Sequence, residues 1–349
     1  MDLIIETYGS GRMLGASADY NFDLQIGADK NDFEISIDYA EFLKFSKLGM
    51  ENFFQIGETV CYVPDEEYGG IIKDIEGATN TEKIYLRGYT WRGMLQEKII
   101  VPPSGQDYKT VSGNLETVLR GLISDAGLSD FFSVLGMIDP PTVSFTFDRY
   151  VTLLLGITKL LKKYNLKMYM YYHPGNMRIW NEDGEVHTYQ EAGRVDLGCT
   201  AIRDYGSEIE ISQDAKMDFS SRDYRMGVNH LICLGTGELQ NRAVVDLYAD
   251  ASGNISQTQT FTGTDEITDT FENVNADAAT LVTQGTERLK TLLNYKKFTA
   301  NAKYIDDINL GIGDTITGRD LITGTVVTQP IKSKIVKLQS GIATVDYKI

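Results

Sequence analysis

The fold is decided by the stretch KIYLRGYTWRGMLQEKIIVPP, which runs from Lys83 to Pro103. Its first half predicts a strand, because Ile84 and Leu86 alternate with polar or amphipathic neighbours at the two-residue period of a sheet with one buried face. Its end predicts an abrupt stop, because Pro102 and Pro103 cannot continue a helix and the residue before a proline favours extended backbone. The chain should therefore leave this unit sharply.

A short helix is predicted between the strand and the prolines. Thr90 is a residue type that caps helix N-termini, and Trp91, Met94 and Leu95 would share one face of the helix. On residue chemistry alone, these side chains would plug one end of a β-barrel, since large apolar residues are usually buried. The proline pair would then redirect the chain into the next part of the protein.

The composition favours a sheet-rich globular protein. The 349 residues suffice for roughly two or three domains, and 20 Tyr and 14 Phe accompany only 7 Pro. No apolar run is long enough to span a bilayer, and residues 1–6 lack the basic and apolar regions of a signal peptide. We therefore expect a protein that is made and kept in a cytoplasm.

Acidic residues outnumber basic ones. The formal charge of −16 comes from 49 Asp and Glu against 33 Lys and Arg, which opposes binding to DNA and argues against sequence-specific nucleic-acid recognition. Residues 243–287 contain no Lys or Arg, and we interpret this acidic stretch as a solvated surface. Its acidic residues are Asp246, Asp250, Asp265, Glu266, Asp269, Glu272, Asp277 and Glu287.

Residues 1–105 are predicted to form a first small β-barrel domain, which strands from 195–235 could complete. Alternating apolar residues in 20–26 and 33–37 flank a turn-forming sequence and predict a hairpin. Residues 71–75 are expected to pair with 84–89.

Residues 106–194 are predicted to form an α+β domain. A first helix would be capped by Asn114 and end at Gly127, and a second would follow Asp148 and end at Asn165. The second helix should bury a stripe made of Tyr150, Leu154, Ile157, Leu161 and Tyr164. A hairpin of 166–172 with 177–180, followed by a turn at 181–184 and a third strand at 186–189, would complete a three-stranded meander.

Residues 195–349 are predicted to form a second β-barrel domain with one inserted helix. Strands are expected at 207–211, 230–234 and 243–248, and again from 308 onward. The helix, at about 275–294, would turn an apolar face toward a core. That face would consist of Ala278, Leu281, Val282, Leu289, Leu292 and Leu293.

No catalytic, cofactor or metal site is predicted. None of the three histidines, His173, His187 and His230, has the spacing of a metal or protease motif. The three cysteines, Cys61, Cys199 and Cys233, lack a C-x-x-C spacing and are interpreted as small buried apolar residues.

Two further patterns are weak signals. Gly235-Thr236-Gly237 follows a strand but lacks the third glycine and the helix of a dinucleotide loop. The acidic run of Asp265, Glu266 and Asp269 departs from the calcium-loop spacing.

The succession of β, α+β and β segments with a late helix resembles the phage tail-tip and baseplate hub proteins, including prophage-encoded tail proteins and the N-terminal hub region of tail-associated lysins. The resemblance rests on residues 88–103, on the helix and hairpin of 148–180, and on Gly313-Asp314 near the end. In this family, a short helix commonly precedes an Arg-φ-φ-x-Pro-Pro stop, and a Leu-Gly-Asp-x-Val strand recurs. Here Lys98 replaces the arginine, and Gly311-Ile312 is inserted before the Gly-Asp pair.

The resemblance implies two barrel-like domains per chain, with the α+β unit and the late helix at the periphery. Three chains would form a six-barrel ring that adapts a hexameric tail tube to a trimeric tip. The implied partners are the tail tube or distal tail protein, the tape-measure protein, and spike or fibre proteins. The implied location is the virion tail tip, after assembly in the bacterial cytoplasm.

We expect a structural rather than enzymatic hub, because no catalytic domain follows Ile349 while many relatives carry one there. Trp91, Met94, Leu95, Pro102, Pro103, Gly313 and Asp314 are its expected structural residues. Two alternatives remain open. One is a cell-wall or glycan hydrolase that uses a carboxylate pair such as Asp65 and Glu67. The other is a carbohydrate-binding receptor module, suggested by the many tyrosines.

Overall fold

The computed structural model describes residues 3–8, 12–17, 21–27, 30–40, 55–175, 178–180, 186–188, 192–208, 210–212, 219–303, 310–339 and 342–348. They form two compact units. Unit 1 comprises Met1–Ile211, Ala300–Thr317 and Thr328–Ile349, and unit 2 comprises Ser212–Thr299 and Gly318–Val327. The boundaries of these units differ from those of the three domains predicted above. The assignment of two β-barrels stays a prediction.

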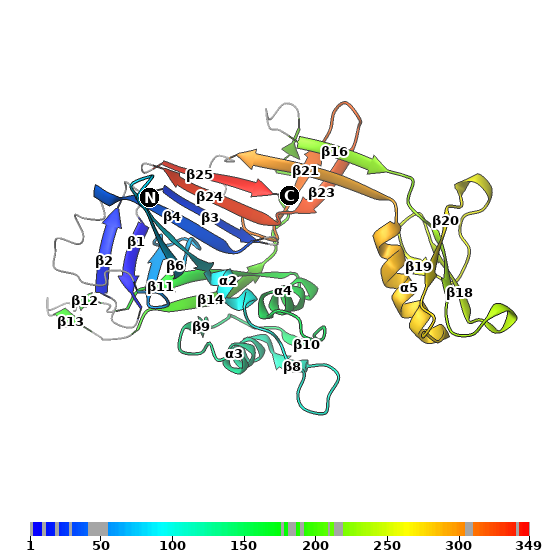
Figure 1. The fold of residues 1–349 in the computed structure, drawn as a ribbon, viewed down its shortest axis with the longest axis horizontal. Coiled ribbons are helices and arrows are strands. Elements are labelled where there is room, and N and C mark those ends of the chain that lie inside the picture. Colours follow the sequence, from blue (N-terminus) through cyan, green and yellow to red (C-terminus); the bar gives the residue numbers. More distant parts are fainter. Residues whose placement is uncertain are drawn as a thin grey trace. The chain divides into compact units, whose positions relative to one another are not determined.

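Unit 1 is built on a curled antiparallel sheet with the form of a half-barrel (Figure 1). The hairpin predicted in residues 20–37 is confirmed, with Asn21 opposite Ser36, and so is the pairing of Ile71 with Tyr89. In spatial order its strands are β21 (Tyr295–Lys303, which begins in unit 2), β25 (Ile342–Lys348), β24 (Ser333–Gln339), β3 (Asn21–Gly27), β4 (Asp32–Asp38), β7 (Lys83–Thr90), β6 (Gly69–Ala78), β5 (Thr59–Tyr62), β1 (Leu3–Thr7) and β2 (Arg12–Ser17).

In the curled sheet, strands β4 and β7 each bury one face. From Phe33 to Ile37, β4 alternates between buried and half-buried positions, so that Phe33, Ile35 and Ile37 enter one apolar cluster with Ile72 and Leu86. Burying such side chains stabilises the sheet by about 1.5–3 kcal/mol each.

The α+β part of unit 1 follows the short helix α2 (Trp91–Gln96). The predicted first helix is confirmed as α3: the Asn114 side chain accepts a hydrogen bond from Thr117 N at 3.3 Å, and Gly127 follows the helix with φ +68°. The elements of this part are β8 (Thr110–Asn114), α3 (Leu115–Asp125), β9 (Phe132–Val134), β10 (Thr142–Thr146), α4 (Leu153–Lys163), β11 (Leu166–His173), β12 (Arg178–Trp180), β13 (Val186–Thr188) and β14 (Arg194–Ala201).

The second helix of this part begins later than predicted. Helix α4 starts at Leu153 because the side chain of Thr152 caps it, accepting from Leu155 N. Tyr150 lies before the helix with φ +55° and is exposed, so it does not belong to the buried stripe. Asn165 does end the helical region, with φ +57°.

The predicted hairpin of 166–172 with 177–180 is wrong. Strand β11 pairs antiparallel with β14, with Met170 opposite Leu197 and Tyr172 opposite Val195, while β12 pairs with β13. The pairing of β11 with β14 is favoured because it places buried apolar side chains of both strands side by side, whereas β12 has only three residues with which β11 could pair. The turn proposed at 181–184 lies outside the described residues.

A small sheet made of β15 (Glu210–Ile211), β22 (Thr315–Arg319) and β23 (Val326–Pro330) completes unit 1, with the far ends of β22 and β23 in unit 2. The mainly β fold with an α+β portion, as predicted, is confirmed.

Unit 2 has its own apolar core between a helix and a four-stranded sheet. Leu281 and Leu289 of the helix are fully buried against Leu231 and Leu247 of the sheet. The predicted late helix is confirmed and is capped by Asp277, although Ala278 is exposed rather than in the core. The elements of unit 2 are β16 (Phe219–Tyr224), β17 (His230–Leu234), η2 (Leu239–Asn241), β18 (Val244–Ala249), β19 (Ile255–Ser256), η3 (Gly263–Asp265), β20 (Thr268–Glu272) and α5 (Ala278–Leu292).

Candidate functional site

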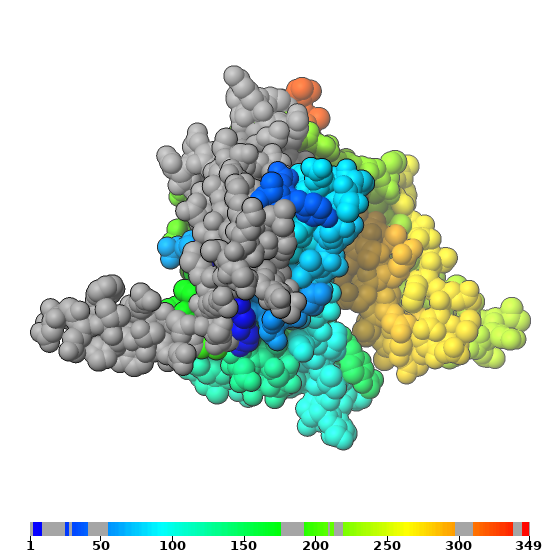
Figure 2. Space-filling view, turned by 60° about the vertical axis from the view of Figure 1, so that its left-hand side comes forward, coloured from blue at the N-terminus to red at the C-terminus, as the bar shows by residue number. Residues whose placement is uncertain are grey.

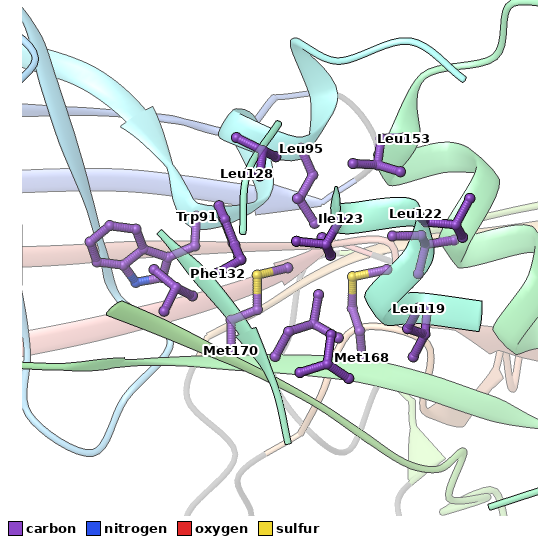
Figure 3. Packing of buried hydrophobic residues seen from close by; sticks show 14 of the residues in the cluster. Trp91, Leu95, Leu119, Leu122, Ile123, Leu128, Phe132, Leu153, Met168 and Met170 are labelled. Carbon is purple, nitrogen blue, oxygen red and sulfur yellow. The ribbon is translucent and has the colours of Figure 1, made fainter. Parts of the chain in front are cut away.

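The helix α2 joins the curled sheet to the α+β part. Thr90 caps it by accepting from Gly93 N at 3.3 Å, as the sequence predicts. Trp91 is fully buried and stacks on Tyr172 of β11, with ring centroids 5.3 Å apart and planes 12° apart. It shares a cluster with residues of α3, α4 and β11 (Figure 3). The indole therefore packs between the sheet and the α+β part.

The other predicted residues of this stretch have different environments. Leu95 is fully buried in the same cluster, and Met94 packs against it with partial exposure. Pro102 is half-buried and Pro103 is exposed. The residues that follow lie at the surface, in the turquoise part of the chain in Figure 2.

A buried ion pair fixes α2 to two other segments. Arg92 donates to Glu67 from Nε to Oε1 at 2.5 Å and from Nη2 to Oε2 at 3.1 Å, and Nη2 also donates to the carbonyl oxygen of Met168 at 3.1 Å. The two side chains are 6% and 17% exposed. Bidentate pairs of this kind are the strong form of a charged hydrogen bond. Arg92 therefore links the β5–β6 connection, α2 and β11.

A second buried ion pair involves the predicted Gly313-Asp314 motif. The Asp314 carboxylate pairs with Lys167 of β11 and accepts from the backbone N–H groups of Gly311 at 2.8 Å and Arg203 at 2.9 Å. Only 1% of the Asp314 side chain is exposed, and Gly313 adopts φ +96°, which favours glycine. Asp314 thus fastens the segment before β22 to the α+β part.

These two ion pairs lie at a pocket of about 310 Å³ within unit 1. Burial is the main cause that raises the pKa of the Glu66 carboxyl in this pocket. Burial also lowers the pKa of Lys334, whose ammonium lies 5.8 Å from the Tyr68 ring centroid and 5.5 Å from that of Tyr347. The lining residues are Glu66, Glu67, Tyr68, Arg92, Lys167, Met168, Tyr169, Tyr171, Thr200, Arg203, Tyr205, Gly311, Ile312, Asp314 and Lys334.

Shifted pKa values in a cavity are typical of functional sites, but structural ion-pair networks produce them as well. Glycoside hydrolysis needs two carboxyl groups free to act on one bond. Glu67 and Asp314 are both committed to cations, so among the described lining residues Glu66 is the one carboxyl without such a bidentate or buried pair. The geometry favours a site that holds segments together. Sequence reasoning missed Arg92 and Lys334, because no local pattern marks them.

The weaker sequence signals also have structural explanations. Glu266 Oε1 lies 2.8 Å from His230 Nδ1, and Asp246 Oδ1 lies 2.9 Å from His230 Nε2, so these carboxylates hold an imidazole. Gly235 and Thr236 hydrogen-bond Ala243 across the start of the β17–β18 pair. In the described part of the chain, no group of three or more His, Cys, Asp or Glu could hold a metal ion.

The cysteines and the acidic stretch differ in their exposure to solvent. Cys61 and Cys233 are fully buried, as predicted, whereas Cys199 is only partly buried; burial raises its thiol pKa to about 12. Five residues of the acidic stretch are exposed (yellow to orange in Figure 2). They are Asp265, Asp269, Glu272, Asp277 and Glu287. None of the helices described is long and apolar enough to cross a bilayer.

The fold as a whole occurs in phage tail proteins. The 43 kDa tail protein of prophage MuSo2 from Shewanella oneidensis is 12% identical with a TM-score of 0.52, over 100% of this chain and 98% of that one. A tail protein from Neisseria meningitidis MC58 gives 12% and 0.50, over 100% and 96%. A chain of the P2 virion baseplate in its activated conformation gives 8% and 0.50, over 99% and 98%.

No family model and no curated protein matches the sequence. At these identities the structural likeness defines the fold, and the chain has the fold of phage tail and baseplate proteins. The resemblance drawn from residues 88–103, 148–180 and 313–314 is confirmed at this level.

Proposed function

We propose that the chain is a structural, non-enzymatic hub of a phage tail tip or baseplate. The observation that carries the proposal is the extent of the likeness: the fold of a prophage tail protein spans 100% of this chain and 98% of the other. Because the likeness runs from end to end, it supports a role for the whole chain in a tail assembly. The carboxylates of Glu67 and Asp314, each paired with a cation, support a structural role in which they hold segments of the chain together.

In this proposal three copies form a ring that adapts the hexameric tail tube to a trimeric tip. Its partners are the tail tube or distal tail protein, the tape-measure protein, and spike or fibre proteins, and it is assembled in the bacterial cytoplasm. DNA or a tail component passes through the ring. The exposed acidic stretch, if it faced the lumen, would repel passing DNA.

Reconstitution with the tail tube protein tests this function. Negative-stain images of the mixture should show threefold rings at the tube end, whereas the chain with Asp314→Ala, which loses the clamp on Lys167, should give few. Tubes without rings at any concentration would refute the hub role. A ring with another symmetry would refute the homotrimer alone.

A second candidate function, binding of a host glycan, is favoured by the tyrosines of the pocket. Tyr171 is 40% exposed and its ring centroid lies 5.4 Å from that of Tyr169, and rings of this kind stack on sugars beside charged hydrogen-bonding groups. A glycan array should then show binding that Tyr171→Ala abolishes. Equal signals for both proteins would refute it.

A further inference from the structure

An apolar groove runs along α4 in unit 1. It has a volume of about 590 Å³, and its apolar wall includes Leu154, Leu155, Ile202, Ile312 and Pro330. Leu155 is 45% exposed although its neighbours Leu153 and Ile157 are buried. An exposed apolar concavity of this size is typical of a site where another chain docks.

The groove is basic, in contrast to the chain as a whole. Among the described lining residues, four carry positive charge and none carries negative charge: Arg92, Lys162, Lys167 and Lys332. Arg92 and Lys167 are neutralised by Glu67 and Asp314. Lys162 and Lys332 both line the groove and are exposed, and neither forms an ion pair with a residue that the structure describes. The groove therefore suits an apolar segment that carries a carboxylate.

The chain carries such a segment on the β9–β10 loop. Ile138 is 97% exposed, and the next residue, Asp139, is exposed with φ +49° and makes no ion pair with any described residue. The loop is held at both ends. Met137 N donates to Glu116 Oε2 at 3.2 Å, and Leu115 N donates to the Pro141 carbonyl oxygen at 3.0 Å. Two prolines after Asp139 limit its backbone further.

We infer that the Ile138–Asp139 knob of one copy docks in the α4 groove of a second copy. Ile138 is 97% exposed, so the knob does not fill the groove of its own chain. The apolar side chain would occupy the groove, and the carboxylate would meet Lys162 or Lys332. Knob and groove are different surfaces, so the contact is head-to-tail and generates a closed ring when the rotation between copies closes. The inference rests on the proposed homotrimer and assigns it an interface.

Charge reversal in the full-length chain tests the pairing, with mass photometry over a concentration series as the readout. Asp139→Lys, and separately Lys162→Glu with Lys332→Glu, should each weaken association at least about tenfold, since close charge pairs at interfaces couple strongly. Combining the reversals should restore much of it. Ile138→Ser should weaken association, while the equally exposed Leu239→Ser, at 93%, should not. All these side chains are exposed, so circular dichroism should be unchanged.

The outcomes separate this interface from the oligomer itself. If the natural chain forms trimers and neither Ile138→Ser nor the charge reversals alter them, the interface is wrong and the homotrimer stands. If Leu239→Ser alone weakens them, the knob lies in unit 2 and the inference is wrong. If the natural chain stays monomeric alone and with the tail tube protein, both the interface and the homotrimer are wrong.

Discussion

Two ion pairs of unit 1 lie largely out of solvent, whereas each Lys or Arg ion pair described in unit 2 includes an exposed side chain. Arg92 with Glu67 and Lys167 with Asp314 are largely withdrawn from solvent, and each pair joins segments far apart in the chain. In unit 2, Arg242 forms an ion pair with Glu272, and their side chains are 24% and 58% exposed. Breaking a buried pair costs far more than breaking an exposed one.

The apolar cores differ in the same way. The large cluster of unit 1 takes side chains from the curled sheet, α2, α3, α4 and β11, whereas the cluster of unit 2 lies between α5 and one sheet. The comparison teaches that damage in unit 1 should spread over many segments, and damage in unit 2 should stay local. The following variants test that difference, in order of decreasing effect.

Trp91→Ala should have the largest effect. Removing a fully buried indole that stacks on Tyr172 leaves a cavity, which costs about 3–5 kcal/mol of the free energy of unfolding. Hydrogen exchange should show weakened protection across unit 1 and unchanged protection in α5, and ring assembly should be impaired. Ile99→Ala, at a residue 47% exposed, is the control. A Trp91→Ala protein as stable as the natural one would contradict this placement.

Asp314→Ala should destabilise unit 1 by about 3 kcal/mol, because it leaves Lys167 without its partner and two backbone N–H groups without their acceptor. Urea unfolding measures the loss. Adding Lys167→Met should recover part of it, since the uncompensated buried charge is then gone. If Lys167→Met lowered the free energy of unfolding as much in the Asp314→Ala chain as it does in the natural chain, the two residues would not act as a pair.

Leu281→Ala in unit 2 should cost about 2–3 kcal/mol by the same cavity argument as Trp91→Ala. Its effect should be confined: hydrogen exchange should accelerate in α5 and β17 but not in β4 or β7. Val282→Ala, at a half-buried neighbouring position, should cost less. Loss of protection in the curled sheet would show that the units are energetically one.

Glu6 gives the smallest effect, and one that depends on pH. Burial raises the pKa of this carboxyl above its ordinary 4.5, against the opposing hydrogen bonds from the Tyr172 and Tyr62 hydroxyls. The folded state then binds the proton more tightly than the unfolded state. The contribution of Glu6 to stability is complete below pH 4.5 and is lost as pH rises through the folded-state pKa.

Glu6→Gln removes this titration. Relative to that of the natural chain, its free energy of unfolding should therefore increase as pH rises from 4.5 toward neutrality, because only the natural chain loses the Glu6 contribution. Urea unfolding at a series of pH values measures the difference, in which the other titrating groups cancel. A difference that stays constant over this range would contradict the burial account of Glu6.

Local patterns in the sequence predicted the elements that depend on neighbouring residues. The caps at Thr90 and Asn114 and the hairpin of β3 with β4 follow from residue type and two- or 3.6-residue periods. The start of α4 was missed because Thr152 competes with Asp148 for the cap, and both are common capping residues.

The rest depends on which distant segments meet. The pairing of β11 with β14 required knowing that Val195 and Leu197 share a face with Met170 and Tyr172. The sequence motif at Gly313-Asp314 marked a residue of importance, but its partner Lys167 is 147 positions away and carries no signal of its own. The sequence therefore marked Asp314 but not the lysine with which it pairs.

Cryo-electron microscopy of assembled tails that carry this chain tests the hub account most directly. The account predicts three copies in a closed ring around the tail axis, at the end of the tail tube, with the Ile138–Asp139 loop of each copy seated against α4 of the next. Finding the chain away from the axis, or absent from the tail particle, would contradict it.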